Sequence, residues 1–562
     1  MSRKAVVLSG VVLLSIAALA VWSGQVPRER EVLREVYSPT FGTVPQEASI
    51  ATTIDELRKE LGSAANQGFL ERLVPDQAGV LWITVLVALA VGFDFSRGRS
   101  SRNLDLILAL ALGLVLFDVM RFFSIRLDPV HWRLLDAVYT VVVALNLALL
   151  VRALWRAAGA GAETPWRPNL RGRPLAAVAV LLAALNVAAA LVRAPDDAGY
   201  FINLGAQRLR ERGRLPYGDP LLTNTPGAAY GPVLYAAHVP FQFLIEPHSP
   251  NPVSGPNPLK EGATYFLPPL LATKLCTITF HLAGLLALFV VGRRLTSEPD
   301  VGWALVALYC GSAFVMGIGG GKESIGGMTF ISHIAPAAST LVAFACLPWP
   351  AASGAMLAVS AGVGFYPAFM LPAWFAFFWR NRVHAIRFGV GFAVAATIIC
   401  GSTWLLSRPA DGRGRIGTIL HDTFGHHTDP QGYGRSPYGF WGQREGIRGW
   451  MTTPLVGESG FSSPSYLLFF GLIGATVWLA RNASASRLAL LTGAIGLASS
   501  LVKIQPTGTY VSWAYPFLLI GIFAGFSSAR GRSAGDGEVT ARERPRAGIS
   551  REGRAGAAAR GR

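Results

Sequence analysis

The chain alternates between long apolar runs and shorter polar connections along most of its length. Runs of roughly 18 to 25 apolar residues are long enough to cross the hydrocarbon core of a bilayer as helices. We expect spans near residues 5–23, 78–95, 104–122, 135–153, 175–193, 265–292, 301–318, 330–349, 388–406, 465–480, 487–502 and 508–526. The stretch 352–378 is interrupted by GFYPAF and predicts two short helices. This pattern predicts about fourteen crossings.

Composition agrees with this pattern, because 51% of the residues are hydrophobic, 15% are charged and the mean hydropathy is +0.40. The apolar runs show no two-residue alternation, whereas the strands of an outer-membrane barrel alternate between lipid and lumen. The sequence therefore predicts an all-α, polytopic helical membrane protein.

The net charge of +17 is concentrated in short connections and in the last 36 residues. The connections SRGRSSRN, RPNLRGRP, GRRL, RNRVHAIR and RNASASR all fall on one side when the spans are counted in order. Short loops rich in Lys and Arg face the cytoplasm. The basic tail lacks the interleaved aromatic residues that stack on bases, so we expect no nucleic-acid partner.

This orientation places three long segments, 24–77, 194–264 and 407–464, on the extracytoplasmic side of an inner (plasma) membrane. The apolar start is typical of a signal anchor, which leaves both termini cytoplasmic, or of a cleaved signal peptide, which leaves the new N-terminus outside. We divide the chain into a membrane module at 1–174, a transmembrane core at 175–526 and a disordered cytoplasmic tail at 527–562 that could contact membrane lipids.

Two adjacent carboxylates, Asp196 and Asp197, lie in APDDAGYFINLG, where the chain leaves the run 175–193. One interpretation is structural, because Asp caps helix N-termini and the following residues predict an interfacial helix that ends at RGRLPYG. Ile202, Gly205 and Leu209 would share its inner face. One carboxylate suffices for a cap, so the second leaves room for a chemical role.

The order of several motifs resembles the GT-C glycosyltransferases, most closely glycosyltransferase family 87, the mannosyltransferase-like group. These motifs are the acidic pair after an apolar span, a Tyr close behind, LPY, YGPVLY, GFYPAFMLPAWFAFFWRNR and YGRSPYGFWGQ, which together cover residues 175–526. The acidic loop of this family normally follows the first span. Four spans precede it here, so we treat residues 1–174 as an added module.

The resemblance implies transfer of a sugar, with mannose as the candidate, from a polyprenyl-phosphate donor to an acceptor hydroxyl on the extracytoplasmic face. The acceptor would be a glycolipid, a glycan or a protein. The family's catalytic base is an acidic residue of the first outer loop, and this role falls on Asp196 or Asp197. A positioned carboxylate that accepts the hydroxyl proton lowers the barrier to attack by a factor of roughly 10² to 10⁴.

The lipid phosphate can leave without protonation by an acid if cations stabilise its charge. The planar guanidinium group of Arg is well placed to donate two hydrogen bonds to phosphate oxygens. Candidate donor phosphate-binding residues near the outer face are Arg208, Arg210, Lys322, His333, Arg435 and Arg444. Candidate sugar- or lipid-binding residues, whose rings can stack, are Tyr200, Tyr217, Tyr230, Tyr438, Phe440 and Trp441. The polar segment that starts at His421 could also bind phosphate through its histidines or simply be a solvated loop.

No cofactor and no metal are expected, because His426, His427 and Asp429 lack the helical spacing that converges on one ion. GIGGGKESIGG lacks phosphate-loop spacing and predicts a hinge. Asp105 and Asp118 are interpreted as interfacial residues rather than a proton relay. The four cysteines lie inside apolar runs and are expected in the core.

Two other function classes stay open. A transporter or flippase of lipid-linked glycans would carry corresponding broken helices in two repeated halves, and the sequence shows no such repeat. A non-enzymatic membrane assembly protein would use the aromatic and Arg-rich loops as binding surfaces.

Overall fold

The structure is a computed structural model of the chain. It describes residues 74–75, 77–123, 129–159, 166–193, 195, 197–220, 222, 226–245, 256–257, 260–264, 270–317, 327–410, 412–425, 463–502 and 508–524. The expected first span, most of the outer loop 24–77, the basic tail and the segment around Tyr438 lie outside these residues. Side chains are also not described for a few helix ends, including 116–123 with Asp118 and 129–140.

The described residues are almost entirely helical, as the apolar pattern predicted. The helices are α4 (Gln77–Val87), α5 (Ser101–Phe123), α6 (Pro129–Ala157), α7 (Gly172–Val192), α8 (Asp197–Arg212), α9 (Pro232–Ile245), α10 (Leu270–Thr296), α11 (Pro299–Cys310), α12 (Ala313–Met316), α13 (Ile331–Ala345), α14 (Pro350–Gly364), α15 (Leu371–Phe378), α16 (Arg382–Leu406), α17 (Arg415–Leu420), α21 (Ser463–Ala480), α22 (Ala485–Val502) and α23 (Tyr515–Phe523). A short antiparallel pair, β1 (Pro256–Asn257) and β2 (Lys260–Thr264), is an addition to the expected all-α fold.

Three of the described helices are long and apolar enough to cross a membrane: Gly172–Val192, Leu271–Thr296 and Arg382–Leu406. Most other expected spans form shorter apolar helices, and the number of crossings stays a prediction. The break expected in 352–378 is confirmed, because α14 ends at Gly364, Phe365 has a φ of 53°, and α15 starts after a 3₁₀ turn.

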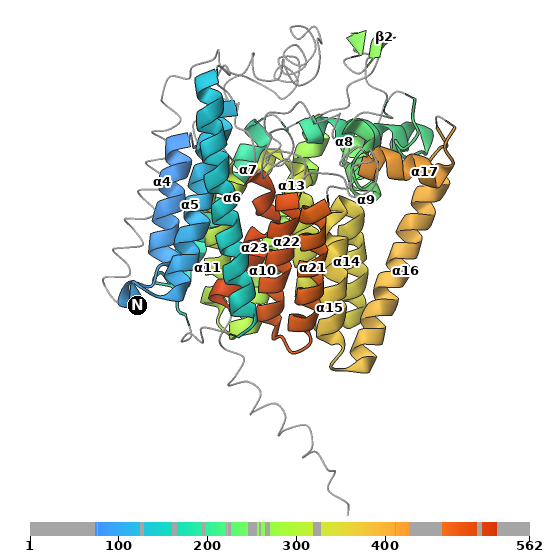
Figure 1. Cartoon of the computed structure of the whole chain (residues 1–562). Helices are drawn as coiled ribbons and strands as arrows, with labels where there is room; N and C mark the ends of the chain where they lie inside the picture. The colour runs from blue at the N-terminus through green and yellow to red at the C-terminus, as the bar shows by residue number, and fades with distance from the viewer. Residues whose placement is uncertain are drawn as a thin grey trace, which may run out of the picture.

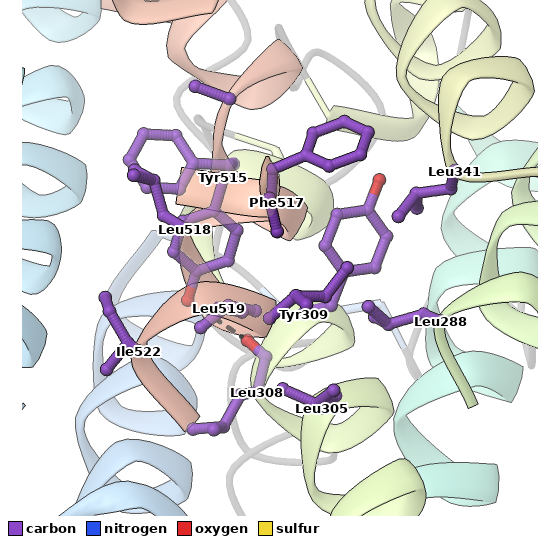
Figure 2. Close-up of a cluster of buried hydrophobic side chains, with 14 of the residues drawn as sticks. Leu288, Leu305, Leu308, Tyr309, Leu341, Tyr515, Phe517, Leu518, Leu519 and Ile522 are labelled. Carbon is purple, nitrogen blue, oxygen red and sulfur yellow. Dashed lines mark hydrogen bonds between the residues drawn. The ribbon is translucent and has the colours of Figure 1, made fainter. Parts of the chain in front are cut away.

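The helices pack as a bundle whose central members are α10, α11, α13 and α23 (Figure 1). Figure 2 shows Leu288 of α10, Leu305 of α11, Leu341 of α13 and Phe517 of α23 within one buried cluster. The hydroxyl of Tyr515 donates to the Leu308 carbonyl at 3.3 Å and links α23 to α11. Apolar side chains and small residues thus fill the centre of the bundle.

The two ends of the bundle differ. We call one end the connection end, because it carries the short turns between α4 and α5, α6 and α7, α10 and α11, α15 and α16, and α21 and α22. Neighbouring turns at this end are joined by hydrogen bonds. Gly172 N–H donates to Asp300 at 2.9 Å, and Arg294 donates to the Ala345 carbonyl at 2.6 Å. The arginine-rich connections described here, including Arg380 and Arg481, lie at this end.

At the opposite end, α8, α9, α17 and their connections form what we call the α8 layer, comprising the described residues of 197–245 and 407–425 (Figure 1). Leu215 N–H donates to the Leu406 carbonyl at 3.0 Å, and Arg408 N–H donates to the Tyr217 carbonyl at 3.1 Å. A second hydrophobic cluster, which includes Ile202, Tyr235 and Ala335, fixes this layer on the bundle.

The cysteines divide into two groups. Cys276 and Cys310 are buried, which confirms the expectation of core positions, and Cys346 is half-buried. The expectation is wrong for Cys400, which is exposed on α16. The reason is that α16 is an outlying helix, with only 11% of its apolar window buried against 50% for α7 and for α10.

Candidate functional site

The corner between α7 and α8 carries the acidic pair. α7 ends at Val192, and the side chain of Arg193 is buried, donating to the Met316 carbonyl and, at 3.1 Å, to the Pro75 carbonyl. The helix predicted after the pair is confirmed as α8, which begins at Asp197, and its position at the membrane interface stays a prediction. Asp196 and the side chains of Asp197 and Tyr200 lie outside the described residues, so their roles stay predictions.

The inner face of α8 is the one that the sequence predicted. Ile202 is fully buried and Gly205 faces the Tyr235 ring so closely that a Cβ there would lie 2.4 Å from it. Asn203 is also buried on this helix, and its side-chain and backbone oxygens accept from Gln242 Nε2 at 2.6 and 2.8 Å. These contacts fix the position of α8 against α9, so the first turn of α8 is held in place by packing.

Two of the predicted sugar-binding tyrosines take part in this support. Tyr217 is fully buried, and its hydroxyl donates to the Tyr230 carbonyl at 2.5 Å. Burial raises the pKa of Tyr217 well above its ordinary value. Tyr230 is half-buried, and its N–H donates to the Tyr235 hydroxyl at 3.1 Å. The structure therefore gives Tyr217 a packing and hydrogen-bonding role within the layer.

The predicted phosphate-binding residues on α8 already have protein partners. Arg208 forms an ion pair with Asp219 at 3.5 Å, and Arg212 approaches the same carboxylate at 3.7 Å. Burial lowers the pKa of Arg208, and the charge of Asp219 opposes this effect. Arg210 contacts the Gln242 carbonyl and Glu211, both at 3.4 Å. These arginines stabilise the turn after α8 in this structure.

His333 of α13, another predicted phosphate-binding residue, is buried among aromatic rings. Its ring centroid lies 4.7 Å from that of Phe330, 4.5 Å from that of Tyr510 and 6.1 Å from that of Trp513. The remaining candidates, Lys322, Arg435, Arg444, Tyr438, Phe440 and Trp441, lie outside the described residues.

Asp422 is a carboxylate that the sequence analysis did not single out. Its side chain is fully buried, and it accepts from Gly218 N–H at 2.8 Å, which joins the segment after α17 to the turn after α8. Its other oxygen lies 3.2 Å from Nδ1 of His421, whose side chain is 33% exposed. Asp422 thus orients an accessible imidazole on the α8 layer. An isolated Asp in a polar loop offers no sequence signal for such a role.

Lys274, in the first turns of α10, is the second residue that the sequence analysis missed. It is 5% exposed, and its ammonium donates to the Leu191 carbonyl at 2.6 Å. The neighbouring Thr273 hydroxyl donates to the Gly199 carbonyl at 3.2 Å. The start of α10 therefore contacts both arms of the α7–α8 corner. A single Lys inside an apolar run is the only signal that could have pointed to it.

Among the residues that the structure describes, no group of three or more His, Cys, Asp or Glu side chains could hold a metal ion. Comparisons with protein-family models, with curated proteins and with solved structures find no match for the chain.

Proposed function

We propose that the protein is an integral membrane glycosyltransferase that moves a sugar from a polyprenyl-phosphate donor to an acceptor hydroxyl at the extracytoplasmic face. The observation that carries the proposal is the α7–α8 corner. In the sequence, two consecutive carboxylates stand where α8 begins, and α8 is held against α9. The corner lies at the end of the bundle opposite the arginine-rich connections, and short Arg-rich connections favour the cytoplasm.

In this proposal Asp196 or Asp197 accepts the proton of the acceptor hydroxyl while the oxygen attacks the anomeric carbon. The bond between that carbon and the donor phosphate oxygen breaks, and the lipid phosphate leaves with the electron pair. Cations near the outer face, with Arg435 and Arg444 as sequence candidates, would stabilise this phosphate. The proton and the charge are thereby accounted for without a metal or a cofactor.

The test uses the full chain in lipid nanodiscs with radiolabelled polyprenyl-phosphate mannose and, in parallel, other lipid-linked hexoses. Asp196→Asn and Asp197→Asn preserve the N-cap, because Asn caps helices nearly as well as Asp. One of the two variants should lose roughly 10²-fold or more of its turnover while folding and donor binding persist, because an amide cannot accept the proton. We expect the larger loss at Asp196.

Full turnover in both single variants and in the double variant would leave the pair with a capping role only. If the protein transfers sugar from none of the donors but moves lipid-linked glycan between the leaflets of proteoliposomes, the result would favour a flippase instead. If the protein shows neither sugar transfer nor glycan movement but stably captures an envelope protein, the result would favour an assembly role.

A further inference from the structure

The turns at the connection end differ in their acidic residues. In the turns that follow α4, α6 and α10, which we call the mixed turns, carboxylates accompany the arginines. Examples are Asp94, in the turn after α4, and Asp300, which accepts from Gly172 N–H at 2.9 Å. The helices α13 to α16 and α21 to α23 lie in two segments, 324–410 and 459–535, that contain no Asp or Glu. The turns of these helices therefore carry cations without a neighbouring acid in the same segment.

The acid-free turns carry a group of exposed cationic side chains, which we call the basic face. Its members are Arg380, Arg382, His384, Arg387 and Arg481. α15 packs along α21, and both helices end at the connection end, so the turns after them lie at the same end of the bundle (Figure 1). Within the part of the chain that the structure describes, these side chains form no ion pair. Like charges gathered on one surface attract an anionic partner.

Exposed tryptophans lie at the same level as the basic face. Trp349 at the start of α14, Trp379 at the end of α15 and Trp478 in the last turn of α21 are 59%, 56% and 71% exposed. Tryptophan is enriched where a membrane protein passes from the hydrocarbon core to the headgroups. The three rings therefore place the basic face at the level of the lipid headgroups.

The basic face also borders an exposed apolar surface. On α16, Val383, Ile386 and Val390 are 54%, 63% and 55% exposed, and they alternate along the chain with the basic residues. α16 is one of the three described helices that are long and apolar enough to cross a membrane. A soluble acidic partner would match the cations but leave this apolar surface uncovered. A phospholipid covers the apolar surface with its acyl chains and brings a phosphate to the cations.

We propose that the basic face is a binding site for anionic phospholipids. Their phosphate groups pair with the arginines, because a guanidinium donates two hydrogen bonds to phosphate oxygens, and their acyl chains lie along the start of α16. The inference goes beyond the proposed function. It requires that the chain crosses a membrane and is independent of sugar transfer.

The experiment measures which lipids stay bound to the full chain. The protein is reconstituted in vesicles with equal amounts of phosphatidylcholine and phosphatidylglycerol of the same acyl chains and is then extracted in a neutral detergent. Native mass spectrometry identifies the bound lipids. We expect phosphatidylglycerol to be retained about tenfold or more over phosphatidylcholine, because each arginine at the headgroup level contributes to the attraction. High salt should lower this preference, since exposed charges are screened.

The variants separate the basic face from net charge. The combination of Arg380→Gln, Arg382→Gln, Arg387→Gln and Arg481→Gln should remove most of the preference, and the four corresponding changes to Lys should keep it. The matched control removes four exposed arginines from the mixed turns through Arg97→Gln, Arg99→Gln, Arg171→Gln and Arg173→Gln. This control should lower the preference by no more than about twofold, because the neighbouring carboxylates already offset part of the attraction.

Four results would overturn the inference. The first is equal retention of the two lipids by the parent protein, and the second is an unchanged preference in the Gln combination. Equal losses in the Gln combination and in the control would assign the preference to net charge. Binding of poly-glutamate without any preference among lipids, abolished in the Gln combination, would assign the face to an acidic protein segment.

Two further points keep the test decisive. If the Gln combination does not fold, Arg380→Gln with Arg382→Gln takes its place, and Arg97→Gln with Arg99→Gln becomes the control. Lipid retention is measured without any turnover, so a chain that transfers no sugar still tests the lipid site.

Discussion

Buried charged side chains have different kinds of partner at the two ends of the bundle. At the connection end, Asp105 is 2% exposed and contacts Arg152 and Arg156, each at 2.5 Å, so its charge is matched within the bundle. At the α8 end, the described contacts of Lys274 and Arg193 are to backbone carbonyls. The carboxylate cluster holds α5 and α6 together through charge pairs, whereas the described contacts at the α8 end join side chains to the backbone of neighbouring segments.

The largest effect on stability is expected at Asp105. Its replacement by Ala leaves two arginines without their carboxylate and should lower the free energy of unfolding by about 3–5 kcal/mol. If the proposed function holds, turnover per folded molecule should not change, because Asp105 lies at the end away from α8. Denaturant or thermal unfolding in nanodiscs measures the loss. Asp94→Ala is the comparison, since Asp94 is half-buried, caps a short turn and meets Arg102 only at 4.0 Å, so its loss should cost about 1 kcal/mol. Equal losses would show that the close pairs of Asp105 contribute no more than this weaker contact.

Gly231 gives the next largest effect and tests how the α8 layer rests on the bundle. A Cβ at this position would lie 2.1 Å from the Gly362 carbonyl oxygen and 2.7 Å from that of Val363. Gly231→Ala should therefore separate α9 from α14 and lower the free energy of unfolding by about 1–3 kcal/mol, and under the proposed function it should reduce turnover as well. Gly401→Ala is the matched control, because nothing lies within 4 Å of its Cβ and Ala favours helices. A stable, fully active Gly231→Ala protein would mean that the layer is not held at this contact.

A smaller loss is expected at Asp422, which joins the two halves of the α8 layer. Asp422→Ala leaves the Gly218 N–H without its acceptor and should lower the free energy of unfolding by about 1–2 kcal/mol. Asp422→Asn retains an acceptor oxygen and should lose less. Unfolding and limited proteolysis of the segment after α16 measure both variants. No difference between Ala and Asn would show that the Gly218 contact contributes little.

The smallest effect compares one cation–aromatic contact at each end. Arg415 lies 4.9 Å from the Trp404 ring at the α8 end, and Arg294 lies 5.3 Å from the Trp349 ring at the connection end. Arg415→Gln should cost about 0.5 kcal/mol. Arg294→Gln should cost more, because Arg294 also donates to the Ala345 carbonyl. The reverse order in parallel unfolding measurements would contradict this ranking.

The apolar runs predicted most of the helices, because helix formation in an apolar environment depends on local composition. The helix that begins at Asp197 was also predicted, since helix start signals are a property of neighbouring residues. The contacts of Lys274 with Leu191 and of Asp422 with Gly218 were not predicted, because each joins residues far apart in the sequence. The partners of Arg208 and the burial of Tyr217 depend on the same kind of tertiary contact.

α16 has a consequence for how the protein would respond to its bilayer. The helix packs mainly on α14, and the rest of its apolar surface is exposed, including Val390, Val394 and Ile398. In a membrane, the tilt of such a helix depends on hydrocarbon thickness as well as on packing. The segment that follows α16 carries Asp422, which binds the turn after α8. A change in bilayer thickness would therefore change the tilt of α16, and α16 would pass this movement on to the turn after α8, which supports the acidic corner.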